Sequence, residues 1–119
     1  MAELIDYDLE FSDGQHVRTS GHAIVGRNPS LENLADQLDG ATDATLVTLQ
    51  DSTKALSRTH FAIGQYEDTL WVADLGSGNG TVLTYPNGST HNLEPGVRYE
   101  VDPGCRIQAG PYSLLVHYG

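Results

Sequence analysis

Four polar side chains, spread over three short stretches of the sequence, could bind an anion together. Arg27 follows an apolar run, and its guanidinium keeps its charge and can bind two oxygens at once. Ser57 offers a compact hydroxyl donor, and Arg58 adds a second cation beside it. Asn79 has an amide donor and an acceptor, so it can bind a peptide main chain. This set of groups suits a ligand that joins several anionic oxygens to a polypeptide.

Glycines surround Asn79. Gly76, Gly78 and Gly80 permit a tight loop with positive φ angles. Asn79-Gly80 is also typical of a plain hairpin turn, and both interpretations can hold at once. We expect Asp74, which precedes the glycines, to cap or brace the same loop.

The same residues allow a different chemistry. Ser57 and His60, with Asp51 or Asp74, are the residue types of a hydrolytic triad, but nothing here resembles a nucleophile elbow. Taken alone, Arg27 would be a solvated cation at the end of a strand, and Ser57 would be a turn hydroxyl. No metal site is predicted, because no metal-ligand spacing links the remaining histidines, which are His16, His22, His91 and His117.

Short alternating runs must position these groups. Between Ile5 and Phe11, apolar residues alternate with acidic ones, which is typical of a half-buried strand. Similar runs follow, and Gly- and Pro-containing turns separate them. The sequence therefore predicts an all-β fold, a predominantly antiparallel β-sandwich of about eleven short strands. The further strands are expected at 16–20, 22–27, 45–50, 60–66, 69–75, 81–85, 90–93, 98–102, 105–109 and 112–118.

One segment has helical spacing instead. Leu31, Leu34 and Leu38 recur at intervals that place them on one face of a helix. Ser30 can cap its first turn. We predict a short helix within 30–39, inserted in a loop between two strands and packed on the sandwich.

The length, charge and cysteine content of the chain limit its possible partners and surroundings. The chain has 119 residues, which predicts a single domain spanning 1–119. Six Lys and Arg against 16 Asp and Glu give a formal net charge of −10, which argues against nucleic acid and anionic membranes as partners. Cys105 is the only cysteine, so no intrachain disulfide can form, and a reducing compartment fits. We expect Cys105 to be buried and slow to react.

The three stretches, in this order, resemble the forkhead-associated (FHA) domain, a phosphothreonine-recognition module. Its loose pattern is Gly-Arg, then Ser-x-x-His, then Asn-Gly. The resemblance covers nearly the whole chain, from the first strand to the last, and the ordered set is more specific than any single motif. The matching positions are Gly26-Arg27, Ser57-Arg58-Thr59-His60 and Asn79-Gly80.

The resemblance implies a role for each position. Arg27, Ser57 and Arg58 would hold the phosphate, and Asn79 would hold the peptide main chain. His60 would be structural, its ring bracing the loop that carries Ser57. Further structural support of the site would come from Gly26, Asp74 and Gly80.

Two departures from the family pattern stand out. Members often carry Thr where this chain has Gly78, so a hydroxyl that helps hold the phosphate is missing. The backbone N–H of Gly78 or a second cation would have to compensate. The segment 28–42 is also longer than usual, which allows the expected helix to shape or cover the binding end.

We therefore expect a non-enzymatic cytoplasmic module without a cofactor. Its partner would be a phosphothreonine-containing protein, either a Ser/Thr kinase or a kinase substrate. Specificity beyond the phosphate would come from the loop 51–56, including Lys54, and from the loop 84–90. Three alternatives stay open: a phospho-independent adaptor on the same fold, a small β-type hydrolase using Ser57 and His60, and a purely structural subunit. FHA domains commonly serve as modules of larger proteins, so a longer parent protein stays open as well.

Overall fold

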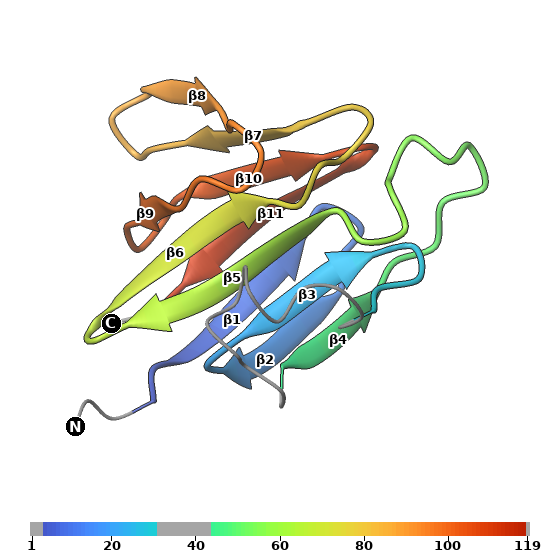
Figure 1. The fold of residues 1–119 in the computed structure, drawn as a ribbon. Helices are drawn as coiled ribbons and strands as arrows, with labels where there is room; N and C mark the ends of the chain where they lie inside the picture. Colours follow the sequence, from blue (N-terminus) through green and yellow to red (C-terminus); the bar gives the residue numbers. More distant parts are fainter. Residues whose placement is uncertain (1–3, 31–43, 119) are drawn as a thin grey trace.

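Two β-sheets pack into a sandwich in the computed structural model, which describes residues 4–30 and 44–118 (Figure 1). The strands are β1 (Asp6–Phe11), β2 (His16–Ser20), β3 (Ala23–Gly26), β4 (Thr45–Thr48), β5 (Phe61–Tyr66), β6 (Thr69–Asp74), β7 (Thr81–Thr84), β8 (Thr90–Asn92), β9 (Tyr99–Val101), β10 (Arg106–Ala109) and β11 (Tyr112–His117). One sheet has the order β2-β1-β11-β10-β7-β8 and the other the order β4-β3-β5-β6-β9. The predicted all-β sandwich is confirmed.

The strand pairing is antiparallel with one exception. β3 and β4 pair in parallel, with Val25 opposite Val47. The chain makes a crossover between these two strands, and only such a connection can bring consecutive strands into parallel pairing. Except for Ser30, the predicted helix within 30–39 lies outside the described residues.

The core lies between the two sheets. Leu9 and Phe11 of β1 face Phe61 and Ile63 of β5, and all four side chains are almost completely buried. Alternation along β1 produces this arrangement, because every second side chain points to the same face. Cys105 belongs to this core and is 0% exposed, and burial raises the pKa of its thiol.

A second, smaller cluster covers the outer face of the five-stranded sheet. Its centre is Trp71, whose ring lies over Gly64, where a Cβ would come within 2.1 Å of the indole. The guanidinium of Arg98 stacks 4.2 Å from the centre of the Trp71 ring. Within the described ranges, no helix is long and apolar enough to span a membrane.

The connections between strands separate into two groups at opposite ends of the sandwich (Figure 1). The end of β3, the β4–β5 loop, the β6–β7 loop and the β10–β11 turn lie at one end, which we call the loop end. The β5–β6 and β7–β8 hairpin turns lie at the other, which we call the hairpin end. The loop 84–90 therefore lies at the other end from Asn79, because four residues of β7, roughly 13 Å, separate the two. Its predicted role in specificity stays a prediction.

Candidate functional site

Backbone contacts join the end of β3 to the segment that follows β4. The N–H of Arg27 donates to the carbonyl of Ser57 at 3.0 Å, and the N–H of Asn28 donates to the carbonyl of Arg58 at 3.0 Å. A Cβ at Gly26 would lie 1.9 Å from the Arg58 carbonyl oxygen. Only glycine therefore allows the two segments to come this close, and the approach places Arg27 beside Ser57.

The Arg27 side chain is held by one bond and is otherwise open. Its Nε donates to the carbonyl of Leu56 at 2.7 Å, which fixes the plane of the guanidinium. Among the described residues, nothing accepts a hydrogen bond from its two terminal nitrogens. Four of its five N–H donors are thus available to a ligand. The sequence carries no signal for the Leu56 carbonyl, because any residue would provide one.

His60 is a structural brace. The ring is 0% exposed. Its Nδ1 accepts the backbone N–H of Ser57 at 3.0 Å, and its Nε2 donates to the carbonyl of Gly80 at 2.8 Å. These two bonds fix the neutral tautomer with the proton on Nε2. They also leave neither nitrogen to accept a proton from the Ser57 hydroxyl, so the geometry of a serine hydrolase is not formed.

Asp74 organises the β6–β7 loop from inside. The side chain is 1% exposed, and its Oδ2 accepts the backbone N–H groups of Gly76 and Ser77, both at 3.0 Å. Its Oδ1 accepts the hydroxyls of Ser77 and Thr81. Four bonds to one buried carboxylate fix the shape of the loop that presents Asn79.

Two hydrogen bonds tie this loop to the β4–β5 loop. The N–H of Gly78 donates to Ser57 Oγ at 2.9 Å, and Asn79 Nδ2 donates to the carbonyl of Ala55 at 2.8 Å. Gly78 therefore supports a ligand only through Ser57, whose hydroxyl proton stays free for donation. Asn79 keeps its second N–H and its Oδ1.

The conformation of Gly78 differs from the one expected. Gly76 and Gly80 both have φ +81°, but Gly78 is not among the glycines with positive φ. A Cβ at Gly78 would meet only Ser57 Oγ, at 3.9 Å, which is an ordinary contact distance. The loop therefore needs glycine at two of the three positions, and Gly78 can accommodate a side chain.

Asp51 organises the β4–β5 loop and was not assigned this role from the sequence. Its Oδ1 accepts the hydroxyl of Thr53 at 2.6 Å and the N–H of Thr53 at 3.0 Å, and its Oδ2 accepts the N–H of Leu56 at 2.7 Å. These bonds, the Thr53 hydroxyl first, lower the pKa of the carboxyl, so it stays ionised. An Asp followed two residues later by Thr is the sequence signal for such a turn.

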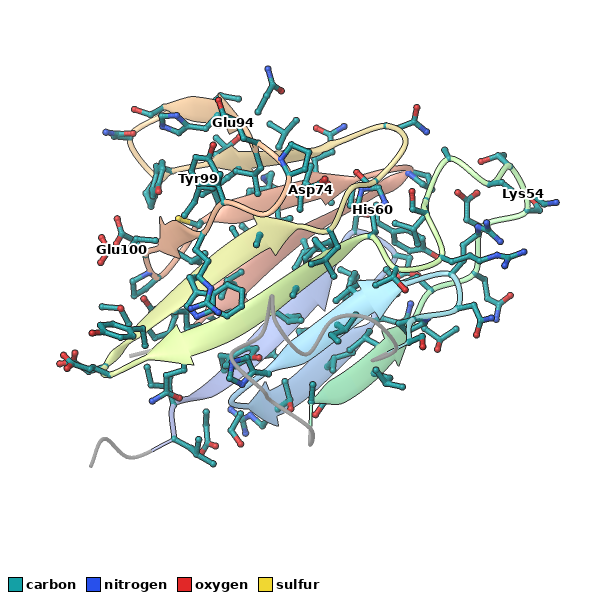
Figure 2. All side chains as sticks on the ribbon, viewed as in Figure 1. Lys54, His60, Asp74, Glu94, Tyr99 and Glu100 are labelled. Carbon is teal, nitrogen blue, oxygen red and sulfur yellow. The ribbon has the colours of Figure 1, made fainter. Side chains whose placement is uncertain are left out.

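Cations concentrate at the loop end. Arg27, Lys54 and Arg58 lie there, three of the six Lys and Arg in the chain. Figure 2 shows Lys54 at the tip of this end and Glu100 on the opposite side of the molecule. Lys54 and Arg58 are exposed, so both can reach a ligand. Acids at the same end include Asp13 in the β1–β2 turn, Asp51 and Asp74.

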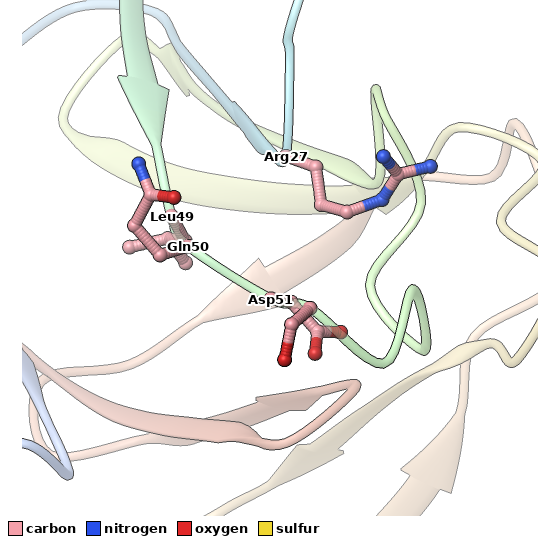
Figure 3. A pocket seen from close by; sticks show the side chains of 5 residues that line it. Arg27, Leu49, Gln50 and Asp51 are labelled. Atoms are coloured by element: carbon pink, nitrogen blue, oxygen red, sulfur yellow. The ribbon is translucent and has the colours of Figure 1, made fainter.

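Two open pockets lie at this end, and the β4–β5 loop contributes to both. The first has a volume of about 410 Å³ and is lined by Arg27, Leu49, Gln50, Asp51 and Ser52 (Figure 3). The second has a volume of about 360 Å³ and is lined by Ala55, Asn79, Gly80, Val82, Gln108 and Gly110. No group of three His, Cys, Asp or Glu side chains in the described part of the chain could hold a metal ion.

Comparison with known proteins gives one consistent match. The model of the FHA domain family matches residues 23–110. A solved structure from a study of phosphothreonine-dependent FHA domain interactions is 23% identical, with a TM-score of 0.64 over 94% of this chain and 95% of that one. The FHA domain of an Arabidopsis thaliana hypothetical protein is also 23% identical, with a TM-score of 0.69 over 96% and 86%. An FHA domain from Chlamydia trachomatis is 19% identical, with a TM-score of 0.67 over 94% and 96%. No curated protein matches the chain.

Proposed function

The chain belongs to the FHA domain family, and on that premise we propose that its loop end captures phosphothreonine in a partner protein. The observation that carries the proposal is the hydrogen bonding of the Arg27 side chain. One bond to the Leu56 carbonyl holds the guanidinium in place, while both terminal nitrogens stay open beside Ser57. A cation that is already oriented loses little side-chain freedom when it binds a dianion.

The ligand groups divide between the phosphate and the peptide. A phosphothreonine carries about −1.5 to −2 charges at pH 7 and three acceptor oxygens. Arg27 would bind two of these oxygens, the Ser57 hydroxyl would donate to the third, and exposed Arg58 would add a second cation. Asn79 would bind the peptide main chain through the N–H and the oxygen that its bond to Ala55 leaves open.

The buried network supports capture rather than catalysis. His60 and Asp74 have their polar atoms committed to the loops, and neither contacts the Ser57 hydroxyl. We propose that the chain acts as one non-enzymatic module in the cytoplasm. Its partner would then be a Ser/Thr kinase or a substrate of one, because a kinase must supply the phosphate.

A peptide titration tests this proposal. Calorimetry would compare one peptide in three forms: with phosphothreonine, with phosphoserine and with unmodified threonine. We expect binding of the phosphothreonine form, weaker binding of the phosphoserine form and none of the unmodified form. Because the site residues alone do not set the partner sequence, a degenerate phosphothreonine library would supply the peptide.

A second candidate function is a phospho-independent adaptor on the same fold. The observation that favours it is Gly78, which lacks a hydroxyl and directs its N–H to Ser57 instead of outward. Equal affinity for the phosphorylated and the unmodified peptide would support this adaptor and contradict phosphate capture.

A further inference from the structure

The pocket beside Arg27 contains a negative charge that a phosphate cannot compensate. Figure 3 shows Arg27 on one side of this pocket and Asp51 on the other. No salt bridge joins the two within the described residues. Their charges are therefore available separately, the cation for a phosphate and the carboxylate for a different group.

The Asp51 carboxylate is bonded by its own loop and keeps its charge. An ionised carboxylate offers about four acceptor positions. The two positions on Oδ1 accept the N–H and the hydroxyl of Thr53, and one position on Oδ2 accepts the N–H of Leu56. The backbone N–H of Ala55 also lies close enough to lower the pKa of this carboxyl, so a ligand would meet Asp51 through its negative charge. The same internal bonds keep the group charged at neutral pH, so it would meet a ligand as an anion.

The rest of the pocket wall suits a long polar side chain. Gln50 and Ser52 are exposed and line the pocket with an amide and a hydroxyl. Ser52 makes no hydrogen bond through its side chain to any residue in the described ranges. At about 410 Å³ and open to solvent, the pocket has ample room for the end of a Lys or Arg side chain.

The charge of the whole molecule favours the same ligand. The formal net charge is −10, and a bound phosphate dianion would offset most of the positive charge of Arg27 and Arg58. A basic segment would then approach an anionic surface, and complementary charge speeds association. An acidic segment would be repelled by the surface and by Asp51 alike.

We propose that this pocket binds a Lys or Arg side chain lying within three residues of the phosphothreonine, so that the chain selects basic phosphothreonine segments. The proposal rests on the proposed function. The position of Arg27 in the wall of the pocket limits how far along the peptide the basic residue can lie from the phosphothreonine. Arg27 lines the pocket and would bind the phosphate, while an extended peptide advances about 3.3 Å per residue. A side chain a few residues from the phosphate therefore reaches Asp51.

A scan of phosphothreonine peptides tests the proposal. Each position from three residues before to three residues after the phosphothreonine would carry Lys, Ala or Glu in turn, on an otherwise neutral peptide. We expect one position or two adjacent ones to favour Lys over Glu by about five- to ten-fold, because an ion pair replaces a repulsion. The preference should shrink at high ionic strength, where exposed charges are screened.

Variants locate the preference in the pocket. Ser52→Lys places a cation beside Asp51 and should reduce the Lys-to-Glu preference to less than about two-fold. Ser89→Lys, an exposed site at the hairpin end, makes the same change in net charge and should leave the preference intact. Asp51→Asn removes the charge itself and should also remove the preference, although it disturbs the loop bonds of Asp51 as well.

The outcomes separate this inference from the proposed function. Phosphate-dependent binding with equal affinity for Lys and Glu at every position would overturn the inference and leave phosphate capture standing. A preference that Ser89→Lys and Ser52→Lys reduce equally would also overturn it, since the effect would then come from overall charge. Binding that does not depend on the phosphate would overturn the proposed function instead.

Discussion

The loop end and the hairpin end are both built from turns between strands, yet they are held together in different ways. At the hairpin end, the side-chain bonds within each turn are local: Gln65 bonds Glu67 across two positions, and Asn87 bonds Ser89 across two, although Gln65 also accepts the N–H of Ile5 across 60 positions. At the loop end, local bonds also shape each loop, but further side-chain bonds connect different loops. Arg27 reaches Leu56 across 29 positions, and Asn79 reaches Ala55 across 24.

The difference shows what a binding end requires. A local turn fixes only its own backbone, so a hairpin can close without organising anything else. Bonds between loops instead set the distance between side chains from different strands. His60 does this twice, since it bonds Ser57 and Gly80, which lie on two loops. The loop end is therefore preorganised, and its ligand groups need little ordering when a ligand binds.

The largest effect should come from Arg27→Ala. The substitution removes the cation that faces the phosphate and leaves a desolvated dianion short of donors. Truncating one partner of such a charge pair costs about 2–5 kcal/mol, which corresponds to a loss of affinity of roughly 30-fold or more. Calorimetry against one phosphothreonine peptide measures it. Unchanged affinity would show that Arg27 is only a solvated cation at the end of β3.

His60→Ala should destabilise the loop end, although it removes no side chain that would contact the ligand. The backbone N–H of Ser57 and the carbonyl of Gly80 would lose their partner, and each unsatisfied buried group costs about 1–3 kcal/mol. We expect denaturant unfolding to show a loss of about 2–4 kcal/mol. Tyr66→Ala, an exposed site at the hairpin end, should change the free energy of unfolding by less than about 0.5 kcal/mol. Similar losses in both variants would remove the contrast between the two ends.

Ser57→Ala should reduce affinity by less than Arg27→Ala. It removes one hydrogen bond to a charged group, which is worth about 1.5–3 kcal/mol. It also leaves the Gly78 N–H without its acceptor, although this exposed group can bond water. The titration used for Arg27→Ala gives the ratio of the two effects. A larger loss for Ser57→Ala would place the main phosphate contact on the hydroxyl.

A matched pair of asparagine variants compares the two ends directly. Asn79→Ala removes a bond between two loops, while Asn87→Ala removes a bond inside one hairpin. We expect Asn79→Ala to weaken peptide binding by about 0.5–1.5 kcal/mol, since the peptide contact and the tie to Ala55 are both lost. Asn87→Ala should leave affinity unchanged. An equal effect of both would mean that Asn79 serves only as a turn residue.

The smallest expected effect is a gain in affinity for the phosphothreonine peptide. Gly78→Thr introduces a hydroxyl where a Cβ has space, and the φ angle there is not one that requires glycine. If the hydroxyl reaches the phosphate, affinity for the phosphothreonine peptide should rise several-fold. Gly80→Thr is the control, because its φ of +81° strains any side chain. No gain at Gly78 would show that the missing hydroxyl is irrelevant to this site.

Much of the fold could be predicted because its signals are local. Alternation and turn residues identified all eleven described strands, each within two residues of its observed ends. The parallel pairing of β3 with β4 carries no such signal, since strand direction depends on the path of the crossover.

The side chains of the site could be predicted from the sequence, because their chemistry depends on residue type. Arg27, Ser57, Arg58 and Asn79 do meet at one end, through contacts that run from Arg27 to Ser57 and from Asn79 to Ala55. The roles of the Ala55 and Leu56 carbonyls could not be predicted, because every residue type supplies a backbone carbonyl. The position of the loop 84–90 at the hairpin end could not be predicted, because strand length decides which end of the sandwich a turn reaches.

The most direct test of the preorganised loop end is an amide NMR titration with one peptide in its phosphothreonine and unmodified forms. We expect the phosphothreonine form to shift the amide signals of 27–28, 57–58 and 77–80, and to leave those of 66–68 and 86–89 at the hairpin end in place. The unmodified peptide should shift neither set. Equal shifts with both peptides, or shifts confined to the hairpin end, would contradict phosphothreonine capture at the loop end.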